Sequence, residues 1–100
     1  MAQATWNGQV IAQVDDSEII TIEGNKYFPP ESVNDEFLEQ SDHKTHCHWK
    51  GESSYYDIVV DDQRNQAGAW YYPEPMEGSV DRVGKNFANY VAFWNGVEVS

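Results

Sequence analysis

Apolar and polar residues alternate over short stretches of the chain, and this period of two is typical of half-buried β-strands. The clearest stretch is 54–60, where Tyr56, Ile58 and Val60 share one face and Tyr55 points to the other. Valine, isoleucine, threonine and aromatic residues dominate the apolar positions, and Leu38 is the single leucine. We expect further strands over 4–6, 9–14, 18–23, 26–28, 45–50, 69–72, 90–94 and 97–99.

Short polar pairs separate these stretches and predict tight turns. Asn7-Gly8 gives the strongest signal, because both central residues of a type I′ turn have positive φ, which Asn and Gly tolerate. Asp61-Asp62 predicts a turn after strand 54–60. Asn95-Gly96 predicts that the last two strands form a closing hairpin.

Two segments have helical signals. Residues 30–38 predict a short helix, in which Ser32 is the N-cap, Asp35 lies at the capping-box distance, and Val33 and Phe37 share a face. Residues 79–85 predict one helical turn, weakened by a glycine. We therefore expect a mainly β protein, a small single domain over residues 1–100 with antiparallel sheets and one or two short helical turns.

Length and cysteine content fit a cytoplasmic protein. A chain of 100 residues builds one modest core, and Cys47 has no partner for a disulfide, which suits a reducing compartment. No apolar run approaches the roughly 20 residues that span a bilayer. The first residues lack the basic and apolar regions of a signal peptide, so we expect no membrane contact.

The charge balance restricts the partners. Seventeen acidic and six basic residues give a net charge of −11. This field repels phosphate backbones, so we expect neither nucleic acid nor an anionic membrane as a partner. It also keeps the chain soluble.

Residues 43–48 hold every histidine and the single cysteine, which makes them the candidate for a zinc site. On an extended strand His46 and His48 share a face while Cys47 points away, and His43 would have to fold back. No further Cys or His completes the ligand set, and Lys50 would repel a dication. We expect no metal and no cofactor, and folding that does not depend on a chelatable ion.

Cys47 is also a candidate nucleophile. Its neighbours His46 and His48 point away from it on a strand, and the acidic chain disfavours a thiolate. A structural thiol, buried or at the edge of a pocket, fits the pattern better. Phosphate-binding glycine loops and the nucleophile elbow of hydrolases are absent from the sequence.

Aromatic residues gather around a rare cation, and they predict a small-molecule site. Ring walls with one polar anchor are the usual construction of such pockets. The alternative is that the rings alternate across the sheet and half of them belong to the core. The predicted ligand-binding residues are Trp49, Lys50, Tyr56, Trp70 and Tyr72.

Two other classes of function stay open. The chain could be an enzyme with Cys47 or a carboxylate as the reactive group, although no complete catalytic constellation favours this. It could also be an interaction module that docks a partner peptide on the aromatic patch. The sequence alone does not decide the biochemical function.

The chain resembles a known family, the domain of unknown function 427, which is sometimes labelled a nucleotidyltransferase-like domain. The resemblance implies a compact β domain of the beta-tent type, whose relatives often hold zinc with two cysteine pairs that this chain lacks. The family usually has proline at His48, so the resemblance implies no metal role for the histidine cluster. The sequence lacks the loop and paired aspartates that nucleotidyl transfer would need. The matching segments are 6–8, 23–30, 47–51, 54–56, 69–75, 91–94 and 97–99.

Overall fold

The chain folds into antiparallel β-structure, and the computed structural model describes residues 1–100. The strands are β1 (Ala2–Trp6), β2 (Gln9–Val14), β3 (Ile20–Ile22), β4 (Asn25–Tyr27), β5 (Leu38–Cys47), β6 (Gly51–Val60), β7 (Gln63–Tyr71), β8 (Val91–Phe93) and β9 (Glu98–Val99). They form three sheets with the orders β2-β1-β9, β3-β4 and β5-β6-β7-β8. The expected mainly β, antiparallel fold is confirmed.

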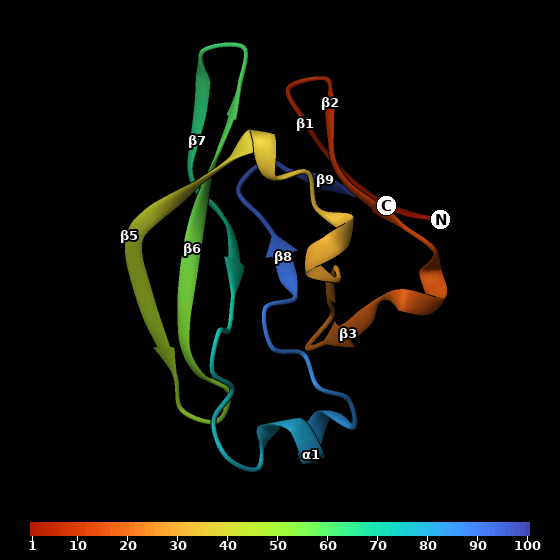
Figure 1. The fold of residues 1–100 in the computed structure, drawn as a ribbon, viewed down its shortest axis with the longest axis vertical. Helices are drawn as coiled ribbons and strands as arrows, with labels where there is room; N and C mark the ends of the chain where they lie inside the picture. The colour runs from red at the N-terminus through yellow and green to blue at the C-terminus, as the bar shows by residue number, and fades with distance from the viewer.

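The four-stranded sheet runs along the long axis of the molecule, with the β1–β2 hairpin and β3 beside it and α1 (Ser79–Val83) at one end (Figure 1). The β3–β4 hairpin continues the edge of this sheet. Phe28 and Val91 exchange two backbone hydrogen bonds of 2.8 Å just beyond β4 and at β8. No helix of the structure is long and apolar enough to cross a membrane.

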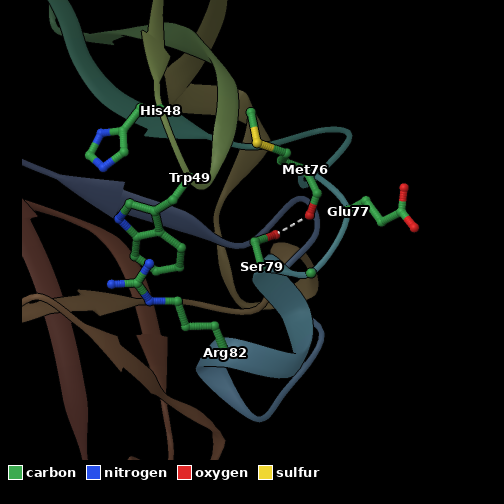
Figure 2. Close-up of a pocket in the computed structure, with 7 residues that line it drawn as sticks. His48, Trp49, Met76, Glu77, Ser79 and Arg82 are labelled. Atoms are coloured by element: carbon green, nitrogen blue, oxygen red, sulfur yellow. Dashed lines mark hydrogen bonds between the residues drawn. The ribbon is translucent and has the colours of Figure 1, made fainter.

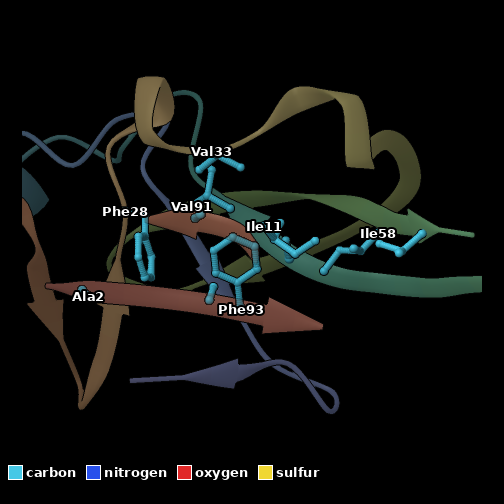
Figure 3. Close-up of a cluster of buried hydrophobic side chains, with 11 residues drawn as sticks. Ala2, Ile11, Phe28, Val33, Ile58, Val91 and Phe93 are labelled. Carbon is cyan, nitrogen blue, oxygen red and sulfur yellow. The ribbon is translucent and has the colours of Figure 1, made fainter. Parts of the chain in front are cut away.

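The four-stranded sheet buries a separate apolar cluster on each face. Ala69 pairs with Phe93 on the face of the larger cluster, and Trp70 pairs with Ala92 on the other face. The smaller cluster consists of Ile20, Ile22, Tyr27, Tyr72, Phe87 and Ala92. The larger cluster, in Figure 3, consists of Ala2, Ala4, Ile11, Ala12, Phe28, Val33, Ile58, Val60, Ala69, Val91 and Phe93.

Two hairpin turns are as predicted. Asn7 and Gly8 have φ of 51° and 76° between β1 and β2. Asp61 and Asp62 have φ of 48° and 66° between β6 and β7. Positive φ at both central residues matches the right-handed twist of the strands that each turn joins.

The predicted closing hairpin is wrong. Asn95 and Gly96 do form a tight turn with φ of 55° and 93°. The strands on either side nevertheless belong to different sheets, because β8 pairs with β7 and β9 pairs with β1. The turn therefore carries the chain from one sheet to the other.

The predicted helix over 30–38 is also wrong. The segment forms two short 3-10 turns, Pro30–Ser32 and Asp35–Phe37, and β5 begins at the residue that follows. Backbone pairing interrupts the helix, because the Asn34 N–H donates to the Ile11 carbonyl at 2.8 Å. The predicted helical turn at 79–85 is confirmed as α1, which ends at Gly84 with φ of 91°.

Candidate ligand-binding site

The turn between β5 and β6 places Trp49 and Lys50. The two strands pair as far as Cys47 and Gly51, so residues 48–50 form a turn and the strand expected over 45–50 ends early. Gly51 has φ of 109°, and a Cβ there would lie 3.2 Å from the backbone nitrogen of Met76. That nitrogen donates to the Lys50 carbonyl at 2.9 Å. The glycine thus lets another backbone segment clamp the turn and fix the base of the Lys50 side chain.

The ammonium of Lys50 is nearly buried. Its side chain is 8% exposed, and it forms an ion pair with the carboxylate of Glu23, which is 55% exposed. Glu23 lies in the turn between β3 and β4, with φ of 53°. The Lys50 Nζ lies 5.4 Å from the ring centre of Trp49 and 5.3 Å from that of Tyr72. A buried cation is therefore held between aromatic rings and one exposed carboxylate.

The pair is ionised at neutral pH. Burial alone would lower the pKa of Lys50, but the hydrogen bond to Glu23 and the charge interactions with Tyr27, Tyr72 and Glu23 together outweigh burial and raise that pKa above its ordinary value. The same hydrogen bond holds the pKa of the Glu23 carboxyl below its usual range. Burial raises the pKa of Tyr72 to about 12, so its phenol stays neutral beside the ammonium.

Lys50 opens onto a hollow of about 210 Å³, here called the Lys50 hollow. Tyr55 and Trp70 face each other across β6 and β7, which puts their side chains on the same face of the sheet. Trp94 completes the wall with its ring edge-on to Trp70, at 6.4 Å between ring centres. The hollow is lined by Lys50, Tyr55, Trp70, Tyr72 and Trp94.

Hydrogen bonds to other parts of the protein fix these rings. The indole N–H of Trp70 donates to the Tyr27 hydroxyl at 3.0 Å, and that of Trp94 donates to the Ala67 carbonyl at 2.6 Å. Tyr55 shares a 3.0 Å hydrogen bond with the Thr45 hydroxyl. These contacts fix the rings of the wall, and Lys50 supplies the charge of the hollow.

The structure brings three of the five predicted site residues together. Lys50, Trp70 and Tyr72 line one hollow. Tyr56 lies on the opposite face of β6, because neighbouring strand residues alternate, and it stacks on Tyr71 at 4.6 Å between ring centres. It does not line the Lys50 hollow.

Trp49 lies beside the Lys50 ammonium but does not line the Lys50 hollow. It lines a second hollow of about 290 Å³ beside α1. The guanidinium of Arg82 lies over its ring, 4.4 Å from the ring centre (Figure 2). Trp49 therefore has a cation–π contact with each of two cations, and its contact with Lys50 helps to hold the lysine in place.

Comparison with known protein families matches residues 1–100 to the family described as a domain of unknown function (DUF427). The chain belongs to the DUF427 family. A search of curated proteins finds no match to it. The resemblance inferred from the sequence is confirmed over the whole chain.

The histidines of this DUF427 chain do not assemble around Cys47. His46 and His48 are exposed, and His48 lies in the turn after β5 rather than on the strand. His43 packs against Tyr55, 4.6 Å between ring centres. Cys47 is half-buried against the smaller cluster, and no group of three or more His, Cys, Asp or Glu is placed to hold a metal ion.

The sequence interpretation missed Glu23, Tyr55 and Trp94. Tyr55 shares a face with Trp70 through the pairing of β6 with β7, a long-range pairing that the sequence does not show. Trp94 follows a buried strand residue and so points to the face opposite Phe93. Nothing local marks Glu23, which lies 27 residues before Lys50 and meets it only in the folded chain.

Proposed function

We propose that this DUF427 domain binds a small ligand that combines a ring or apolar body with a carboxylate or phosphate group. The ligand occupies the Lys50 hollow, its anionic group on the Lys50 ammonium and its body against Trp70, Tyr72 and Trp94. One observation carries the proposal: a side chain only 8% exposed presents its charge to a ring-walled hollow.

The energetics of the ion pair support a binding role. Burying an ammonium is costly, and a pair with a half-exposed carboxylate recovers only part of that cost. An apolar side chain of similar size would pack against Trp49 and Tyr72 without the penalty. Stability alone therefore gives little reason for a lysine at this position.

The partner of Lys50 is suited to exchange. Glu23 is largely in water and lies in a tight turn, so its side chain can leave the ammonium without uncovering the core. An incoming carboxylate or phosphate would take over its hydrogen bond. The net charge of −11 does not prevent this, because charges beyond about 8 Å are largely screened at physiological ionic strength.

The size of the hollow sets the size of the ligand. A volume of about 210 Å³ is below the ~300–1,000 Å³ of drug-sized pockets. One aromatic ring with its anionic substituent fits this scale. Benzoate and phenyl phosphate are suitable probes, and benzyl alcohol is their uncharged counterpart.

The proposal is tested by NMR titration of the labelled protein with these three compounds. We expect saturable shifts at the indole N–H groups of Trp70 and Trp94 with the two anions and much smaller shifts with benzyl alcohol. Lys50→Met should abolish the anion-dependent shifts, whereas Lys85→Met, which removes an exposed charge, should bind as the wild type does. Equal binding by both variants, or equal binding of the alcohol, would remove the role assigned to Lys50.

A further inference from the structure

A third hollow lies on the opposite face of β6, and it is lined by an acidic residue where the Lys50 hollow is lined by a basic one. It has a volume of about 340 Å³. Val33, Leu38 and Val91 form its apolar part, and Tyr56 contributes an aromatic ring. Asp35 and Asn89 contribute the polar groups. This set, here called the Tyr56 hollow, shares no residue with the proposed anion site.

The charge around the Tyr56 hollow is negative. No basic residue lines it, and the carboxylate of Asp35 forms no ion pair within the protein. The segment that carries Asp35 also has Glu31 and Glu36 and no basic residue between Pro30 and Phe37. An anion placed here would meet this local negative charge, with no basic residue in the lining to offset it.

Both arginines of the chain contact other parts of the protein. Arg64 bonds to Glu39 at 2.9 Å and to Asp57 at 2.7 Å, and Arg82 lies over Trp49. The hollow therefore has a carboxylate without an internal counter-charge.

Tyr56 is held in place by stacking, and the charge of Asp35 is one of the causes that raise its pKa. Tyr56 stacks on Tyr71 with an angle of 17° between the rings, and Tyr71 in turn donates to Gln40 at 2.9 Å. Burial, the neighbouring Tyr71 and the charge of Asp35 raise the pKa of Tyr56 to about 12. The phenol thus remains neutral at physiological pH, and its electron-rich ring adjoins an anionic group.

We infer that the Tyr56 hollow binds a small organic cation, an amine or quaternary ammonium with an apolar body. The cationic group lies between the Asp35 carboxylate and the Tyr56 ring, the two kinds of group that attract an ammonium. The Asn89 side-chain carbonyl accepts a hydrogen bond from a protonated amine. The apolar body packs on Val33, Leu38 and Val91, and the volume of about 340 Å³ holds one saturated ring.

The test is an NMR titration with three molecules of one shape: cyclohexylamine, which is cationic at pH 7, cyclohexanol and cyclohexanecarboxylate. The amine should cause saturable shifts at the backbone amides of Val33, Leu38 and Val91, and the alcohol and the carboxylate should not. A lack of saturable shifts with the amine, or equal binding of the alcohol, would overturn the inference.

Two variants separate a site from general attraction to an acidic surface. Asp35→Asn and Glu31→Gln each remove one negative charge from the same exposed segment, and neither side chain takes part in an internal hydrogen bond that folding needs. Asp35→Asn should weaken amine binding by at least about five-fold, and Glu31→Gln should change it by less than about two-fold. Equal weakening by both variants would mean diffuse attraction and would overturn the assignment.

Discussion

The indole N–H of Trp70 donates a 3.0 Å hydrogen bond to the hydroxyl of Tyr27, a residue 43 positions earlier in the chain. The two rings meet edge to face, with 6.1 Å between their centres and an angle of 90°. Tyr27 is fully buried at the end of β4, and Trp70 forms a wall of the Lys50 hollow from β7. This contact therefore ties the proposed site to the smaller apolar cluster.

Removing the Tyr27 hydroxyl, which accepts the hydrogen bond from Trp70, should lower the stability of the fold and loosen the Trp70 side of the Lys50 hollow. Tyr27→Phe keeps the ring but leaves the partly buried Trp70 N–H without its partner, which should cost about 1–3 kcal/mol of unfolding free energy. Urea denaturation measures the loss. Tyr90→Phe, at a partly buried tyrosine packed on the same cluster, is the control and should cost less. Equal losses of unfolding free energy in the two variants would contradict a stabilising role for the hydrogen bond between Trp70 and Tyr27.

Gly51 should tolerate alanine less well than another glycine with positive φ. Gly24 has φ of 82° and open space around a Cβ, whereas at Gly51 the Cβ would meet the backbone of Met76 and Glu74 at 3.2 and 3.3 Å. Gly24→Ala should lose about 1–2 kcal/mol from backbone strain alone, and Gly51→Ala about 1–3 kcal/mol more from crowding. The difference between the two urea midpoints is the measurement, and no difference would contradict the clamp on the Lys50 turn.

The fold was predictable where local backbone chemistry decides it. Asn7-Gly8 and Asp61-Asp62 specify positive φ at both positions of a turn, and neighbouring residues supply both strands. The turn at Asn95-Gly96 was equally clear from the sequence. The strands on either side of it, β8 and β9, nevertheless pair with β7 and β1 and not with each other. Long-range pairing of this kind leaves no local signal.

A long-range backbone contact also explains why the helix predicted over 30–38 does not form. Its capping and facing residues were suitable, but pairing of Asn34 with Ile11 draws the backbone out of helical geometry. Tertiary hydrogen bonds outweighed a weak local preference. Short elements are the most exposed to such competition, because each has few internal bonds of its own.

The candidate site was predictable in part for the same reasons. Trp70 and Tyr72 share a face through strand alternation, so they join Lys50. Tyr55 and Tyr56 are adjacent, and only the pairing of β6 with β7 shows which of them faces Trp70. The Glu23 carboxylate could not be assigned to Lys50 before the β3–β4 hairpin was placed beside the β5–β6 turn.

Tyr72 and Tyr56 should ionise at a higher pH than a tyrosine of the unfolded chain. Burial raises the pKa of Tyr72 and of Tyr56 to about 12. In the unfolded chain each phenol ionises near ~10. The stability that these two groups contribute is therefore complete below pH ~10 and is lost as the pH rises from there to about 12. In the native protein, phenolate absorbance should show a late step that becomes smaller in Tyr72→Phe and in Tyr56→Phe. An unchanged late step in either variant would contradict the burial assigned to that ring.

Glu23 should compete with the ligand of the Lys50 hollow. Glu23→Gln removes the charge that occupies the ammonium, so benzoate should bind about five-fold more tightly, as expected when a neutral hydrogen bond replaces a charged one. Titration of wild type and variant measures this ratio. Glu18→Gln, at an exposed acid without a basic partner, makes the same change in net charge and should leave the affinity nearly unchanged. Weaker binding in Glu23→Gln would mean that Glu23 helps to hold the ligand.

The most direct test of the proposed function is a crystal structure of this protein with phenyl phosphate bound. The account predicts a phosphate oxygen within hydrogen-bond distance of the Lys50 Nζ, the phenyl ring against Trp70 and Trp94, and the Glu23 carboxylate turned into solvent. A probe bound elsewhere, with Glu23 still paired to Lys50 and the Lys50 hollow empty, would contradict it.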